Sequence, residues 1–170
     1  MNLIRHTMLM LALACSFVAG AAAADSMVTE GVVSAPVAEV WSAFATSEGL
    51  RSWMAPHADI DLRVDGLMRA NYKPEGTLGD GSTIVNRVLS FEPRRMLSMR
   101  VAKAPDDFPF PGAIMAMWTV VYFDDLPDAK TRVRVVSMGF TPDAESQKMR
   151  AFFERGNAYT LMKVQEKFAK

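Results

Sequence analysis

The stretch TPDAESQKMRAFFERGNAYTLMKVQEKF, residues 141–168, decides the fold, because it has the pattern of one long amphipathic helix. Thr141 as N-cap, Pro142 at the first helical position and acidic residues in the first turn are consistent start signals. At about 25 residues the predicted helix is longer than is usual in a globular domain. Its apolar face is formed by side chains at helical spacing: Met149, Phe152, Phe153, Gly156, Thr160 and Val164.

Before this helix the hydrophobic pattern changes to a period of two, which is typical of strands. From His57 onward Ile60, Leu62 and Val64 alternate with polar residues, and Asp65-Gly66 predicts a tight hairpin turn. The other expected strands cover residues 27–34, 67–73, 83–91, 96–102, 114–124 and 131–140.

Two short helices are predicted between the first two strands. Pro36 marks the start of the first helix, and Thr46 caps the second. Strands joined by short turns are antiparallel, and one long helix on one curved sheet buries both apolar faces. The sequence therefore predicts an α+β domain over residues 25–170, in which an antiparallel sheet of about seven strands wraps around the C-terminal helix.

Residues 1–24 are typical of a secretory signal peptide. Arg5 supplies a positive charge, residues 8–20 are mostly apolar, and Ala22 and Ala24 are the small residues before the cleavage site. The apolar run is shorter than the ~20 residues that span a bilayer. We expect cleavage after Ala24 and a periplasmic or secreted protein. Cys15, in a loose lipoprotein box, leaves acylation as the less favoured alternative.

Composition excludes several functional classes. Cys15 is the only cysteine, so the mature chain is expected to have no disulfide and no thiolate site. The 19 basic residues balance 19 acidic ones without a basic face, so nucleic acid is not an expected partner. The mature chain has no second long apolar segment, so we expect no membrane span in it.

No metal or cofactor is expected. His6 leaves with the signal peptide, so His57 is the one histidine of the mature chain, and a multi-histidine zinc site is excluded. Met115 and Met117, expected on one face of a strand, offer soft ligands for Cu(I). No histidine or cysteine accompanies them, and methionine is a common filler of adaptable cavities.

Six stretches together resemble the START-like, or SRPBCC, superfamily with its helix-grip fold. They are APVAEVW at 35–41, WMAP at 53–56, DLRVDG at 61–66, VLSFEP at 88–93, WTVVYFDDL at 118–126 and NAYTLMKVQEKF at 157–168. The nearer resemblance is to the bacterial branch related to activators of heat-shock ATPases and to polyketide cyclase-like proteins. It implies a lipid-like, aromatic or polyketide-like ligand in a cavity between sheet and helix, whereas a minority of the superfamily catalyses cyclisation or dehydration. Export argues against a co-chaperone role, because no ATPase partner is expected outside the cytoplasm.

The candidate ligand-binding residues are the aromatic, apolar and inward-directed polar side chains of this cavity. Gly156 indicates either close packing of helix against strand or space left for a ligand. Arg87 and Arg100 would hold a ligand carboxylate if either pointed inward. The full set is Trp53, Tyr72, Arg87, Arg100, Phe108, Phe110, Met117, Phe152, Phe153 and Gly156.

Three functional hypotheses follow. The first is an exported, non-catalytic protein that binds a hydrophobic or amphipathic small molecule. The second is a polyketide cyclase or dehydratase in which His57, Asp59 or Tyr72 transfers protons, although a surface histidine is the simpler interpretation of His57. The third is an interaction module of the cell envelope that uses the loop around Phe108 and Phe110, residues 103–113, as its contact.

Overall fold

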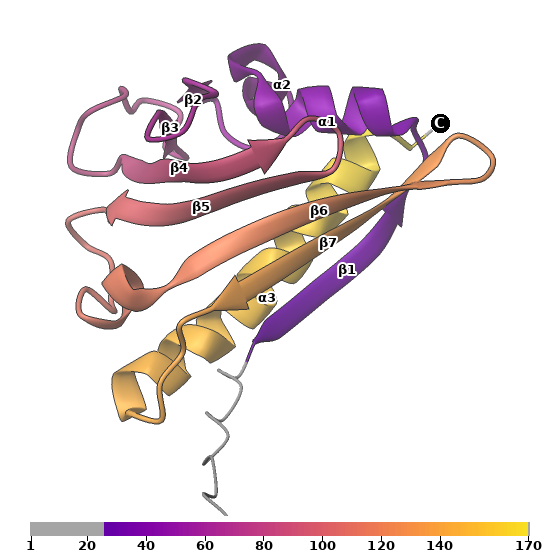
Figure 1. The fold of residues 1–170 in the computed structure, drawn as a ribbon. Helices are drawn as coiled ribbons and strands as arrows, with labels where there is room; N and C mark the ends of the chain where they lie inside the picture. The colour runs from indigo at the N-terminus through magenta and orange to yellow at the C-terminus, as the bar shows by residue number, and fades with distance from the viewer. Residues whose placement is uncertain (1–25, 170) are drawn as a thin grey trace, which may run out of the picture.

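Seven antiparallel strands form one curved sheet in the order β1-β7-β6-β5-β4-β3-β2 (Figure 1). The computed structural model describes residues 26–169. Two short helices follow the first strand and one long helix ends the chain, which confirms the predicted α+β helix-grip architecture. The elements are β1 Met27–Val33, α1 Val37–Ala45, α2 Ser47–Arg51, β2 His57–Ile60, β3 Leu67–Asn71, β4 Ile84–Glu92, β5 Met96–Lys103, the 3₁₀ helix η1 Ala113–Ala116, β6 Trp118–Leu126, β7 Lys130–Met138 and α3 Ala144–Lys167.

The hairpin between β2 and β3 is wider than predicted. β2 ends at Ile60, and the Asp61 N–H donates to the Leu67 carbonyl, which closes the hairpin before the predicted turn. The loop then folds on itself, because the Gly66 N–H donates to the Arg63 carbonyl and Asp65 has a positive φ of 62°. The prediction of a strand through Val64 with a two-residue turn was therefore wrong.

The segment before β6 is helical instead of extended. Residues Ala113–Ala116 form η1, and the strand begins only at Trp118. Both the Gly112 and Ala113 N–H groups donate to Glu145 Oε1 of α3, at 3.0 and 3.2 Å. Met115 and Met117 therefore do not alternate on a strand, contrary to the prediction: Met115 is exposed and Met117 is buried.

Helix α3 begins two residues later than predicted. Asp143 is its N-cap and accepts the Ser146 N–H at 3.0 Å, while the Thr141 hydroxyl donates to the same carboxylate. Both bonds favour the charged carboxylate, so the pKa of Asp143 is lowered, chiefly by Thr141. The predicted Thr141 cap was wrong because the aspartate takes the capping position.

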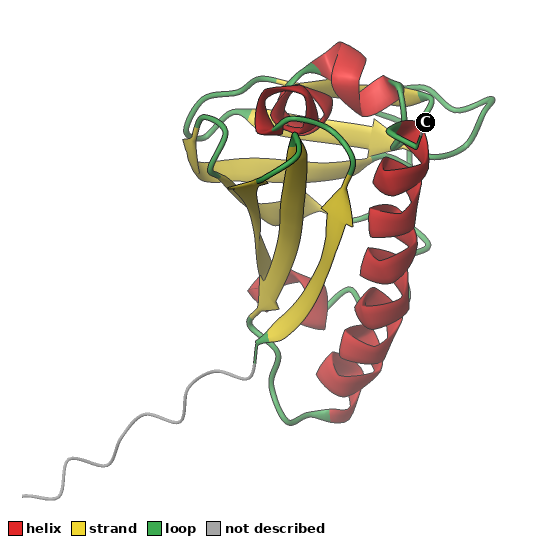
Figure 2. Ribbon diagram, turned by 90° about the vertical axis from the view of Figure 1, so that its right-hand side faces the viewer, coloured by secondary structure: helices red, strands yellow, loops and turns green. Residues whose placement is uncertain are grey.

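Helix α3 lies on the concave side of the sheet, against β1 and η1 (Figure 2). The apolar core on this side is divided into clusters. One cluster, which we call the upper cluster, contains Leu161 and Val164 from the C-terminal half of α3, packed with Val33 and Val133. A second cluster, which we call the lower cluster, contains Met149 from the first turns of α3. It also includes Met27, Ile114, Met117 and Phe140.

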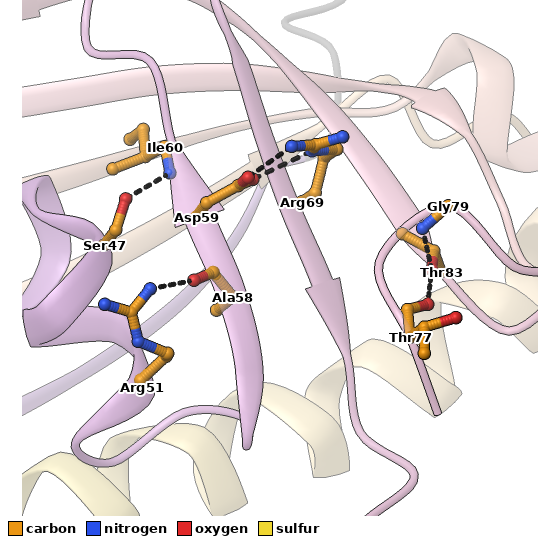
Figure 3. A network of polar contacts seen from close by, with 9 residues as sticks. All are labelled: Ser47, Arg51, Ala58, Asp59, Ile60, Arg69, Thr77, Gly79 and Thr83. Atoms are coloured by element: carbon orange, nitrogen blue, oxygen red, sulfur yellow. Dashed lines mark hydrogen bonds and ion pairs between the residues drawn. The ribbon is translucent and has the colours of Figure 1, made fainter. Parts of the chain in front are cut away.

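Side chains cover both open edges of the sheet. On β2, the Ile60 N–H donates to Ser47 Oγ at 3.1 Å and the Ala58 carbonyl accepts from Arg51 at 2.9 Å (Figure 3). On β1, the Val32 carbonyl accepts from Gln165 Nε2 at 2.9 Å. These bonds occupy backbone groups that an exposed edge strand would offer to another chain. Across residues 26–169, none of the helices combines the length and the apolar character that crossing a bilayer requires.

Candidate functional site

The middle of α3 is less deeply buried than its two ends. No residue of α3 between Met149 and Leu161 is buried, although both of these anchors are. A Cβ atom built on Gly156 meets no heavy atom within 4 Å outside its own helix backbone and neighbours. Close helix–strand packing, the first interpretation of Gly156, is therefore wrong, and the second interpretation, open space, fits the structure.

We call this region the central space and define it by the four half-buried residues on the inner face of α3: Phe153, Gly156, Asn157 and Thr160. They occupy the same helix face as the anchors Met149, Leu161 and Val164, because their spacings follow the 3.6-residue turn. None of these four inner side chains carries a charge.

The strands opposite Gly156 present hydroxyl groups. Asn157 Nδ2 donates to Ser137 Oγ on β7 at 3.2 Å, and Ser137 Oγ lies 3.5 Å from Thr119 Oγ1 on β6. Ser137 and Thr119 are directly paired across the two strands, and Ser137 is completely buried. Ser137 therefore ties the middle of α3 to the sheet, and the three side chains in this chain of contacts are all neutral.

Tyr72 follows the end of β3. Strand alternation places it on the same face as Met68 and Ala70, which belong to the core, and so on the side of α3. Its side chain is 59% exposed, yet desolvation by surrounding atoms raises its pKa. Tyr72 is thus an exposed side chain at the end of β3, on the side of the sheet that carries α3.

A network of hydrogen bonds among Asn71, Thr77, Asp80 and Thr83, which we call the polar knot, fixes the loop that follows Tyr72. It was not predicted from the sequence. Asn71 is fully buried and donates to the Thr77 carbonyl at 3.1 Å and to Asp80 Oδ1 at 2.8 Å. Asp80 also accepts the Thr77 and Ser82 N–H groups, which lower its pKa. The Thr83 hydroxyl completes the knot by bonding the Thr77 carbonyl and the Gly79 N–H (Figure 3). Strand alternation places Asn71 on the face opposite Met68 and Ala70, so the sequence carries no signal that this side chain is buried.

Four of the predicted ligand-binding aromatics form one cluster at the N-terminal end of α3. Phe108 and Phe110 lie 5.7 Å apart, and each lies 5.8 Å from Phe152. Phe153 packs edge-on against Phe152 at 5.4 Å. The loop 103–113 therefore closes this end of the central space with rings that pack on α3.

Trp53 does not join that cluster. Its ring lies 4.8 Å from Phe44, and its indole N–H donates to the Ala43 carbonyl at 2.9 Å. It thus packs against the upper cluster, in which Phe44 is buried, whereas Phe108 and Phe110 pack against the lower one. Met117 is also buried in the lower cluster.

The two arginines of the predicted site lie on the other side of the sheet. Leu97, Met99 and Val101 of β5 face the core, so Arg100 between them faces away from α3. Arg87 pairs directly with Arg100 and shares that face. Neither arginine points inward, so neither can hold a ligand carboxylate inside the central space.

The three weak catalytic candidates do not converge. His57 Nε2 lies 2.9 Å from the Pro74 carbonyl, and Asp59 forms an ion pair with Arg69 (Figure 3). Because Ala58 and Ile60 face the core, His57 and Asp59 lie on the opposite face from Tyr72. Among residues 26–169, no group of three His, Cys, Asp or Glu side chains is placed to hold a metal ion.

The family model described as "Activator of Hsp90 ATPase homolog 1-like protein" matches residues 34–168. The chain belongs to this family. The match confirms the superfamily that the sequence motifs indicate. A search of curated proteins found no matching sequence.

Solved structures share the fold at low sequence identity. The Aha1 dimer from Colwellia psychrerythraea superposes with a TM-score of 0.67 and 13% identity, over 85% of this chain and 96% of that one. Protein MLL2253 from Mesorhizobium loti superposes with a TM-score of 0.66 and 19% identity, over 84% of this chain and 96% of that one. DynU16, a protein of the dynemicin biosynthetic locus, superposes with a TM-score of 0.61 and 17% identity, over 84% of this chain and 46% of that one. At these identities the likeness shows the fold alone.

Proposed function

We propose that this family member binds a neutral hydrophobic or amphipathic small molecule in the central space between α3 and the concave face of the sheet. The observation that carries the proposal is Gly156, whose inward side meets no atom within 4 Å although the helix is anchored at Met149 and Leu161. Unfilled space in a protein interior costs stability, and a bound molecule would restore the missing contacts.

The chemistry of the surrounding side chains supports a neutral ligand. Phe153 and the aromatic cluster supply apolar surface, while Asn157, Thr160 and Tyr72 supply hydrogen-bonding groups without a formal charge. A charged ligand group here would lose its hydration without gaining an opposite charge. Flat or alicyclic molecules with a few hydroxyl or carbonyl groups fit this combination best.

Binding is favoured over catalysis because Tyr72 alone of the three acid–base candidates lies on the side of α3. The cyclase or dehydratase hypothesis needs a donor and an acceptor within hydrogen-bond reach of one substrate. His57 and Asp59, on the opposite face, do not provide the second group. The interaction-module hypothesis is likewise weakened, because Phe108 and Phe110 pack on Phe152 instead of standing free.

The proposal is tested by purifying the protein from its native host or a related one and recording native mass spectra beside chromatography of an organic extract. We expect a small neutral molecule in the native complex that is absent from Gly156→Leu, in which a side chain enters the central space. The control Tyr159→Leu changes an exposed position of the same helix and should retain the molecule. A wild-type protein without any copurifying molecule, and without affinity for neutral apolar probes, would overturn the proposal.

The proposal places this binding outside the cytoplasm. The supports are Arg5, the apolar run 8–20 and the small residues Ala22 and Ala24, all of which lie outside the described residues. Activation of a cytosolic ATPase is accordingly no part of the proposed function. N-terminal sequencing of protein from the periplasmic fraction should begin at Asp25, whereas an intact Met1 in the cytosol would contradict the assignment.

A further inference from the structure

A second hollow lies on the convex face of the sheet, on the side away from α3. Its volume is about 350 Å³, and its walls come from β4, β5, η1 and the start of β6. Two of its apolar side chains are partly exposed, Trp118 at 37% and Met115 at 44%. The residues around it are Leu89, Arg100, Met115, Ala116, Met117 and Trp118.

A β-bulge adds a third apolar wall. Val88 pairs with Met99 and Ser90 pairs with Ser98, so Leu89 between them is the extra, unpaired residue of β4. Bulges redirect side chains, and this one lets Leu89 line the same hollow as Arg100 and Trp118. The hollow therefore has an apolar floor built from three separate elements.

Arg100 is the one charged residue among the six. It lies directly opposite Trp118 on β6 and directly opposite Arg87 on β4. Like charges in directly opposed strand positions destabilise a sheet. Arg87 contacts Asp65, at 3.8 Å between charged atoms, whereas no ion pair holds Arg100 within the described part of the chain.

From this juxtaposition we propose that the convex hollow binds an amphiphilic monocarboxylate. The carboxylate bonds the guanidinium of Arg100, whose planar fork matches a carboxylate in two parallel hydrogen bonds. The apolar part lies against Trp118, Met115 and Leu89. The volume is at the lower end of small-molecule sites, so the fitting class is a short alkyl or aryl carboxylate. This site is separate from the central space and does not depend on the proposed function.

Octanoate is a suitable probe, with octan-1-ol as its uncharged counterpart. The chain has three tryptophans, so the ¹⁵N indole signals of protein expressed from the full chain report on three places at once, and Trp118→Phe assigns one of them. We expect octanoate to shift the Trp118 signal saturably and to leave the Trp53 signal, whose N–H is bonded to Ala43, unchanged. Arg100→Gln should weaken binding about tenfold or more, because a charge-assisted hydrogen bond is lost.

The matched control is Arg132→Gln, an exposed arginine on the same face of β7, which should leave the affinity unchanged. Gly156→Leu should also bind octanoate normally, which separates this site from the central space. Equal affinity for octan-1-ol, an unaffected Arg100→Gln variant, or shifts at Trp53 in place of Trp118 would overturn the proposal. A Trp118 shift with phosphatidylglycerol vesicles but not with octanoate would also overturn it, in favour of a membrane contact.

Discussion

The two ends of α3 and its middle are built differently. At the ends, Met149 and Val164 have no exposed surface and Leu161 has little, whereas Gly156 in the middle faces open space. A helix of this length could bury an unbroken apolar stripe, and that would stabilise it further. The ends of α3 thus provide the stability, and the middle leaves the room in which the proposed ligand binds.

The largest expected effect is at an anchor. Met149→Ala should lower the free energy of unfolding by about 2–5 kcal/mol, because it leaves a cavity in the lower cluster. Tyr159→Ala, at a position that is 59% exposed, should change it by no more than about 0.5 kcal/mol. Urea unfolding monitored by circular dichroism measures both. Equal losses would show that the helix is not held by its ends.

A smaller effect is expected in the loop after β3, where polar bonds replace apolar burial. Asn71→Ala removes the buried amide that ties Thr77 and Asp80 together, and should cost about 1–3 kcal/mol. The same unfolding experiment measures the loss, with Ser90→Ala at an exposed strand position as control. A cost below about 0.5 kcal/mol would mean that the knot does not fix this loop.

The same knot predicts a pH dependence. Backbone N–H groups of Thr77 and Ser82 lower the pKa of Asp80, so its charged form is favoured in the folded state. This stabilisation is complete above the unfolded pKa of about 3.9 and is lost as the pH falls through the lower folded pKa. Urea midpoints between neutral pH and about pH 3 should therefore fall more steeply for wild type than for Asp80→Asn. Parallel profiles would contradict the assignment.

Two glycines sharpen the comparison between end and middle. A Cβ on Gly31 of β1 would lie 2.8 Å from Leu161 Cδ2, at the packed end, whereas one on Gly156 meets nothing. Gly31→Ala should therefore destabilise the protein by about 1–3 kcal/mol through overpacking. Gly156→Ala should stabilise it by up to about 1 kcal/mol through helix propensity. Thermal unfolding of the two variants side by side gives the signs, and a loss in both would contradict an open middle.

The architecture was predictable because it rests on local patterns. The 3.6-residue spacing of residues 141–168 and the period of two from His57 each identify a buried face, and short turns require antiparallel strands. Boundaries failed where a side chain or a turn took over the backbone's hydrogen bonds, as Asp143 does at α3 and Asp61 does at the end of β2.

The site was less predictable because it depends on contacts between distant segments. Arg100 lies in a strand with apolar residues on both sides, so spacing does not tell which face meets α3. The sequence of the loop 103–113 does not predict that Phe108 packs on Phe152. The meaning of Gly156 likewise depends on how far α3 lies from the strands, a distance that is set by the anchors at its two ends.

The most direct test of the open middle is the binding isotherm of a neutral apolar fluorophore, N-phenyl-1-naphthylamine, to wild type and to Gly156→Leu. A leucine that projects into unoccupied space should leave the unfolding free energy within about 1 kcal/mol of wild type. It should weaken fluorophore binding about tenfold or more, because it occupies the volume that the ligand needs. Unchanged affinity in Gly156→Leu would contradict the account, since the fluorophore would then bind somewhere other than between α3 and the sheet.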